Sequence, residues 1–337
     1  MTFLLPELHP DTAPETAALQ RRLLSTDSGV RRVALLAFAD IEDEVLLPTI
    51  AGLLRLDPEP ELRAEAARAL AGWDDADVVD ALADALNDKP AVRQAAAQAL
   101  TELKDGVAGA RLVPHASHAD SFVCGAALRA LRELRVPAAA EPALAALRHA
   151  DAGVRREAVG VLGWLKQSDA LAPLAELAVG DADAEVRRAA AGALGLASHT
   201  DAPAVLPALC SALRDAAWAV REEAATTLGK LVAGEVAVGA SARAASGAAL
   251  REAMDDPYWQ VRLRAARSLG RLRDNAALAV LTEALLHPAG NLRKEAAIAL
   301  GEIGDTTAVP ALQAAEADPD PEVRKAVRLA LQRLVSP

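Results

Sequence analysis

The amino-acid sequence predicts an all-α fold, a right-handed α-solenoid of about ten helix pairs. A Val-Arg or Leu-Arg pair recurs along the chain at spacings of 30 to 34 residues, with one spacing of 41. Apolar residues stand four and eight positions after the first residue of each pair. They lie on one side of a helix with 3.6 residues per turn. Of the 337 residues, 52% are hydrophobic but only 2% are aromatic. The core is therefore expected to consist of Ala, Leu and Val, which let helices approach closely.

Each repeat is expected to hold two helices, and the second helix, here called helix B, carries the recurring pair. The first residue of the pair is called the anchor. Nine anchors are followed by Arg and one by Cys, nine have Ala at the fourth position after them, and nine have Leu at the eighth. The apolar helix A precedes helix B, and Asp or Pro between them supplies a cap and a turn. The anchors are Val30, Leu62, Val92, Val123, Val154, Val186, Val220, Val261, Leu292 and Val323.

The repeats follow one another without a break, so one solenoid domain over residues 1–337 is predicted. The columns fail only at the ends, where Phe38 replaces Leu and Val327 replaces Ala. Terminal repeats are expected to turn polar faces to water. The long spacing predicts a flexible loop at about 233–247, either a lid or a neutral insertion. In order, the repeats lie at about 13–41, 42–73, 74–104, 105–135, 136–166, 167–198, 199–232, 233–273, 274–304 and 305–337.

The segments "DPDPEVRKAVRLAL" and "NLRKEAAIALGEIGDTTAVPAL" resemble HEAT repeats, specifically the short type found in phycobilin lyases. The resemblance extends over about 17–335. It implies that the B helices line a concave side and that the arginine after each anchor forms a ladder to acidic side chains and carbonyls between repeats. Such repeats occur in adaptors, assembly factors and a few enzymes, so the resemblance is specific for the fold rather than for one function.

Charge and composition limit the classes of partner. The net charge of −11 disfavours general binding to nucleic acid, which needs a field that attracts phosphate. No apolar run approaches the roughly 20 residues of a membrane span. The start of the chain lacks the basic and long apolar regions of a signal peptide. Two cysteines do not make a disulfide scaffold. A cytoplasmic protein with reduced thiols and no membrane partner is expected.

One short stretch contains residues that can ligate zinc: His115, His118, Asp120 and Cys124. The repeat favours a structural interpretation, because His118 shares its position with His149 and His287 near the end of helix A. No metal and no cofactor are predicted. The His-Glu pairs with which some HEAT-like enzymes hold iron are absent, as are phosphate-binding loops and nucleophile elbows. No catalytic residue is predicted, and whether the protein is an enzyme stays open.

Aromatic residues interrupt the repeat pattern at positions expected to face outward. Trp218 and Trp259 occupy a position that other repeats give to small residues or Pro, while Trp73 fits the core. Exposed Trp and Arg are typical of binding hot spots. A low floor of Gly160, Ala189 and Gly192 is expected between a tryptophan wall and an arginine wall. The alternative is that the two tryptophans pack on each other. The predicted partner-binding residues are Phe122, Trp164, Trp218, Tyr258, Trp259, Arg264, Arg267 and Arg271.

The predicted function is a non-catalytic scaffold, adaptor or assembly factor that binds a partner protein in its concave groove, with an acidic partner segment meeting the arginines. One alternative is a phycobilin-lyase-like lyase or chaperone-lyase subunit, by resemblance. Another is a HEAT-like DNA glycosylase, which the net charge of −11 and the scarcity of lysine disfavour.

Overall fold

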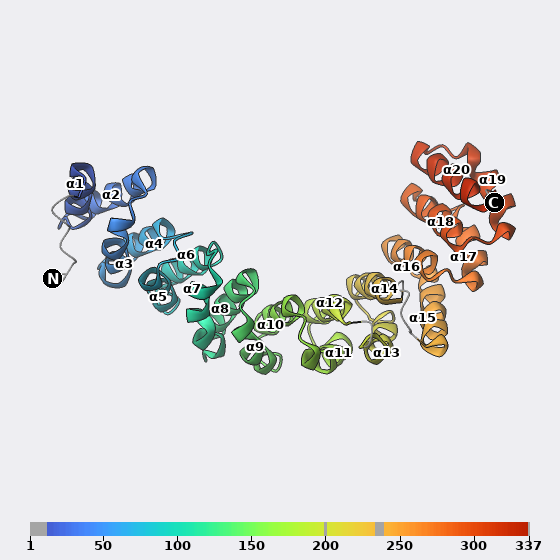
Figure 1. Cartoon of the computed structure of the whole chain (residues 1–337), viewed down its shortest axis with the longest axis horizontal. Coiled ribbons are helices and arrows are strands. Elements are labelled where there is room, and N and C mark those ends of the chain that lie inside the picture. Colours follow the sequence, from blue (N-terminus) through green and yellow to red (C-terminus); the bar gives the residue numbers. More distant parts are fainter. Residues whose placement is uncertain (1–11, 199–200, 233–238, 336–337) are drawn as a thin grey trace. The chain divides into compact units, whose positions relative to one another are not determined.

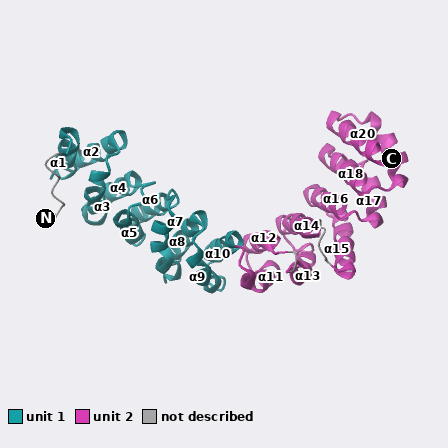
Figure 2. Cartoon of the chain, in the orientation of Figure 1, with its two compact units in different colours: residues 1–165 teal, residues 166–337 magenta. Residues whose placement is uncertain are grey.

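The computed structural model describes residues 12–198, 201–232 and 239–335, and within these ranges it contains twenty α-helices and no strand (Figure 1). Two α-helices fall in each predicted repeat. The predicted all-α solenoid of helix pairs is confirmed. The chain divides into two compact units, residues 1–165 and 166–337 (Figure 2). The division falls where the fifth repeat ends, and the single-domain assignment stays a prediction.

In the first unit, five helix pairs follow one another. Short 3-10 turns lead into several of the A helices, as at Glu44–Leu46. The pairs are α1 (Pro14–Leu23) with α2 (Ser28–Ile41), α3 (Leu47–Leu56) with α4 (Pro60–Ala69), α5 (Ala76–Ala85) with α6 (Pro90–Leu100), α7 (Gly106–Gly109) with α8 (Ser121–Leu134), and α9 (Ala140–Ala146) with α10 (Ala152–Leu165).

The second unit repeats the arrangement with five more pairs. They are α11 (Leu171–Gly180) with α12 (Ala184–Ala193), α13 (Ala202–Ala212) with α14 (Trp218–Val232), α15 (Ala240–Glu252) with α16 (Trp259–Leu272), α17 (Leu278–Ala284) with α18 (Gly290–Ile303), and α19 (Val309–Ala314) with α20 (Pro321–Val335).

The columns of the repeat form the core. All ten residues four positions after the anchor are fully buried, and so are the residues eight positions after it in the first nine repeats. Phe38 is buried in the first repeat and lies 6.1 Å, between ring centroids, from Trp73. Trp73 is only half-buried, so it lies at the edge of the core rather than inside it. Burial of the columns stabilises each repeat only through its neighbours, as expected for a solenoid.

The outer face of the first repeat is apolar, which contradicts the expected polar cap. Val30, Val33 and Leu36 are exposed on α2. In later repeats the anchor lies against the preceding helix B: a Cβ at Gly125 of α8 would touch Val154 of α10. Within the described residues no helix B precedes α2, and its anchor Val30 is exposed. The last repeat does carry exposed polar side chains on α20, among them Lys325 and Arg328.

The loop predicted at about 233–247 is helical over part of its length. Residues 233–238 lie outside the described residues, and α15 begins at Ala240. Alanine and serine fill this segment, and Ser246 and Gly247 are buried against neighbouring elements. The prediction of a loop through residue 247 was wrong there, because burial of one face outweighed the composition.

The first helix of the fourth repeat is broken. A single turn, α7, is followed by a 3-10 segment at Ala110–Ser117 that contains Pro114. Proline has no N–H to donate and clashes with the preceding turn of an α-helix. The segment still buries Leu112 and Ala116, so the repeat keeps its place in the stack.

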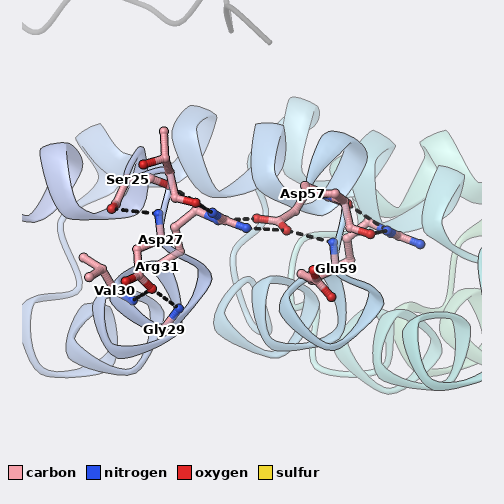
Figure 3. Close-up of polar contacts among 10 residues, drawn as sticks. Ser25, Asp27, Gly29, Val30, Arg31, Asp57 and Glu59 are labelled. Carbon is pink, nitrogen blue, oxygen red and sulfur yellow. Dashed lines mark hydrogen bonds and ion pairs between the residues drawn. The ribbon is translucent and has the colours of Figure 1, made fainter.

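The predicted arginine ladder is present (Figure 3). Arg31 donates from Nε and Nη2 to the two oxygens of Asp57, at 2.7 and 3.0 Å, and from Nη1 to the carbonyl of Ser25. The same Asp57 accepts the N–H of Glu59 and so holds the turn just before α4. Each rung therefore joins a helix B to the A–B turn of the next repeat. Two-pronged arginine–aspartate pairs of this kind are Arg31–Asp57, Arg63–Asp88, Arg187–Asp215, Arg221–Asp256 and Arg293–Asp318.

Candidate partner-binding surfaces

The first unit has a pocket of about 360 Å³ between α6, α8 and α10. Ala97, Gly125 and Ala126 are part of its lining, and Phe122 stands beside them. The guanidinium of Arg93 lies 4.2 Å from the centre of the Phe122 ring and also pairs with Asp120. The pocket thus combines small apolar residues with one aromatic ring, a combination that can take an apolar side chain.

An ion-pair network borders this pocket. Glu157 is buried and accepts from Arg129 at 3.0 Å and from Arg132 at 2.7 Å. Arg132 crosses directly over Gly160, where a Cβ would lie 2.8 Å from the Arg132 Cδ. Glu223 covers Gly192 in the same manner in the second unit. The predicted low floor is therefore not bare at these two glycines, because long side chains of adjacent repeats lie over them.

Trp164 stands near the end of α10, with 54% of its surface exposed. The guanidinium of Arg135, which follows α8, lies 4.5 Å from the centre of its ring. Cation–π contacts at exposed sites stabilise by about 0.5–1 kcal/mol. This contact orients the ring and leaves much of it free.

The second unit carries a pair of stacked aromatic rings. Trp218, at the start of α14, and Tyr258, just before α16, lie 5.6 Å apart between centroids at an interplanar angle of 17°. They remain 37% and 45% exposed. Arg221 lies 5.7 Å from the Tyr258 ring while it pairs with Asp256 of the ladder. The ladder thus holds the two rings in place.

Tyr258, rather than Trp259, is the ring that stacks on Trp218. Trp259 is the first residue of α16 and is half-buried. In the described structure the two tryptophans make no ring contact with each other. The alternative of Trp218 packing on Trp259 was therefore wrong. Trp218 does pack on an aromatic ring of the next repeat, but that ring is Tyr258.

Two of the three predicted arginines are already paired inside the protein. Arg264 donates to Glu222 at 3.0 Å, and Arg267 donates to both oxygens of the buried Glu295 at 2.8 and 2.7 Å. The bond to Glu295 raises the pKa of Arg267. Arg271 is exposed and has no ion pair within the described ranges. Of the three, Arg271 has the charge that a partner could reach without displacing a carboxylate.

The eight predicted residues belong to both units. Phe122 and Trp164 lie in the first unit, and the other six lie in the second. The structure brings together Trp218 and Tyr258 in one unit and Arg93 and Phe122 in the other. Sequence reasoning missed Glu157 and Glu295. Their signal was an Arg six positions after one anchor followed by a Glu three positions after the next.

The His-Cys stretch has a structural arrangement. His118 Nδ1 accepts the N–H of Asp120, and Asp120 accepts from Phe122 and Val123 as the cap of α8. Cys124 is buried, its Sγ lies 3.0 Å from the Ala116 carbonyl, and burial raises the pKa of its thiol. Within the described residues, no three His, Cys, Asp or Glu side chains are grouped as metal ligands.

No helix in the described ranges is both long enough and apolar enough to cross a bilayer.

The comparisons with known proteins concern the fold and the family. No curated protein matches the chain. The solved structures that share its fold include an engineered protein, which is 22% identical with a TM-score of 0.59 and covers 96% of this chain and 99% of its own. They also include YibA of E. coli, which is 21% identical with a TM-score of 0.58 and covers 77% of this chain and 92% of its own. The family model for HEAT repeats matches residues 47–132, 109–195, 171–245 and 247–332. It is a general model, so the phycobilin-lyase type stays a prediction. With its repeating helix pairs and these matches, the chain belongs to the HEAT-repeat family.

Proposed function

We propose that the protein is a non-catalytic scaffold or adaptor that binds a partner protein through exposed aromatic residues at its B helices. The HEAT-repeat fold is a scaffold for protein interaction, and this chain adds aromatic rings where other repeats have small residues. The observation that supports the proposal best is the exposed stack of Trp218 on Tyr258, held by Arg221.

A rigid, exposed aromatic pair favours binding for two physical reasons. Its rings offer a large apolar area whose burial is favourable, roughly 25 cal/mol per Å². The rings are also already ordered by stacking, so little side-chain entropy is lost when a partner covers them. Trp and Tyr are enriched among residues that dominate interface energy for these reasons.

Each unit contributes its own proposed partner-binding surface: Phe122 and Trp164 in the first unit, and Trp218, Tyr258, Trp259 and Arg271 in the second. Arg264 and Arg267 form the ion-paired border of the second surface, since Glu222 and Glu295 already neutralise them. An acidic partner segment would meet Arg271 rather than all three arginines.

The test begins with capture of the partner from the native host and continues with the two purified proteins. Trp218→Ala and Trp259→Ala should each weaken binding about thirtyfold, because a hot-spot aromatic truncated to Ala costs about 2 kcal/mol. Val107→Ala is the matched control, since Val107 is also an exposed apolar residue but lies on α7, a helix A. Equal affinities for wild type, Trp218→Ala and Val107→Ala would refute the proposal.

A further inference from the structure

The arginine ladder breaks at Arg262. In repeat nine the position that holds Asp256 in repeat eight is occupied by His287. Arg262 therefore lacks the aspartate that the next repeat supplies to other ladder arginines. Its Nε is buried and has no hydrogen-bond partner. Within the described residues its side chain makes no hydrogen bond or ion pair, not even the carbonyl bonds that Arg221 and Arg293 make from Nη1.

Asp256 of repeat eight does not serve Arg262. Asp256 lies close enough for the Arg262 charge to help lower its pKa. Both of its oxygens, however, accept from Arg221, at 2.6 and 3.0 Å, and one also accepts the N–H of Tyr258. A buried guanidinium nitrogen without a partner costs free energy that a carboxylate would recover.

His287 keeps one role of the missing aspartate and adds a donor. Its Nδ1 accepts the N–H of Ala289 at 3.0 Å, as Asp256 accepts that of Tyr258. Burial, followed by the charges of Arg262 and Arg293, lowers the His287 pKa, so the ring is neutral at pH 7. With Nδ1 accepting, the proton of a neutral ring is on Nε2. His287 is thus a hydrogen-bond donor where other repeats have an acceptor.

Arg262 and His287 line one pocket of about 350 Å³, together with Met254, Val280 and Leu286. Leu286 is 85% exposed and provides an apolar surface at the edge of the pocket. Asp255 and Glu283 are exposed and also line it. Their charges oppose a multiply charged anion such as phosphate more strongly than a single carboxylate, which the guanidinium of Arg262 attracts.

The other histidine positions do not offer this combination. His149 stands at the aspartate position of repeat five, but the ladder arginine of repeat four, which would face it, is replaced by Cys124. The pocket of about 220 Å³ beside His149 therefore has no ladder arginine. At His118 the ladder arginine is Arg93, which pairs with Asp120 and lies over Phe122. Among the three, Arg262 keeps its charge unpaired.

We propose that this pocket receives the carboxylate of an Asp or Glu side chain from an extended segment of a partner protein, with an apolar neighbour of that residue on Leu286. The carboxylate would take the place of the missing ladder aspartate, accepting from Arg262 and from His287 Nε2. The lining of this pocket shares no residue with the aromatic surface, and neither site requires the other.

Three ligands test the proposal with the full-length protein by saturation-transfer NMR titration: acetyl-Ala-Asp-Leu-amide, its Asn counterpart, and sodium acetate. The Asp peptide should bind at least about tenfold more tightly than either of the others, since each 1.4 kcal/mol is tenfold in affinity. Equal binding of the Asn peptide would overturn the carboxylate site. Equal binding of acetate would overturn the docking of a peptide segment.

Two variants and one control locate the site. His287→Asp should restore the ladder, abolish binding of the Asp peptide and raise the melting temperature. Arg262→Gln should also abolish binding, with helix content checked by circular dichroism. Arg328→Gln removes one positive charge from an exposed position on another helix B, α20, and should leave binding unchanged. Retained binding in His287→Asp overturns the proposal even if Arg262→Gln fails to fold.

Discussion

At the scale of single residues, this repeat protein uses arginine in two distinct ways. The arginine directly after the anchor joins consecutive repeats through a buried aspartate, as Arg187 joins Asp215. Two arginines six positions after an anchor pair with a glutamate of the next repeat: Arg129 with Glu157 and Arg267 with Glu295. In the Arg187 and Arg267 pairs the planar guanidinium meets both carboxylate oxygens, a geometry that lysine cannot provide.

The burial of the glutamate should decide what such a pair contributes. Glu295→Gln should lower the free energy of unfolding by about 1–3 kcal/mol, because it weakens two charge-assisted bonds to a buried acceptor. Glu185→Gln is the control: its pair with Arg188 is exposed and local, and such pairs contribute about 0–1 kcal/mol. Urea unfolding measures both. Equal losses in the two variants would mean that burial of Glu295 adds nothing.

At the scale of helices, the repeat pattern predicted the fold closely because the core is periodic. Each column of small and apolar residues marks the side of helix B that faces the core. From α4 to α18 the residues of these columns are buried. The pattern could not predict the exposure of Val30, because within the described residues no helix B precedes α2 and covers it. Nor could it predict α15, where composition suggested a loop and tertiary burial decided otherwise.

The candidate surfaces were less predictable for a similar reason. An outward position in the repeat identified Trp218 and Trp164 as exposed. Which ring Trp218 stacks on depends on the turn before α16, where Tyr258 is extended and lies ahead of the helix. The pairing of Arg264 and Arg267 depends on carboxylates of other repeats. Contacts between repeats therefore lie beyond a pattern that describes one repeat at a time.

Close approach of neighbouring B helices gives a prediction at this scale. A Cβ at Gly270 of α16 would lie 2.7 Å from the Cα of Ala299 on α18, a backbone atom that cannot move away alone. Gly270→Ala should therefore destabilise the protein by about 1–3 kcal/mol. Gly180→Ala, at the end of α11 with nothing within 4 Å, should be neutral or stabilising by up to about 1 kcal/mol. Thermal unfolding of the two variants tests this, and a stable Gly270→Ala would contradict the packing of α16 on α18.

At the scale of the whole molecule, the ladder makes stability depend on pH. Hydrogen bonds from Arg63 and Arg293 lower the pKa of Asp88 and Asp318, respectively, despite the opposing effect of burial. For Asp215 and Asp256 burial raises the pKa, but bonds from Arg187, Arg221 and backbone N–H groups outweigh it, and the pKa is lowered. These four aspartates are therefore stabilised in their ionised form.

The sign of the effect follows from linkage. A carboxyl whose pKa is lower in the folded than in the unfolded state contributes stability that is complete above the unfolded value, about 3.9 for Asp. That contribution is lost as the pH falls through the folded value. Because the rungs recur in both units, their losses add, and unfolding by urea should become easier below about pH 4. Asp215→Asn isolates one rung, since it cannot ionise. Its stability deficit against wild type should be largest at neutral pH and shrink toward pH 3, because protonation of Asp215 then removes the same charge from the wild type. A deficit that stays constant over this range would mean that Asp215 stabilises the fold through its shape and its hydrogen bond from the Ala217 N–H rather than through its charge on Arg187.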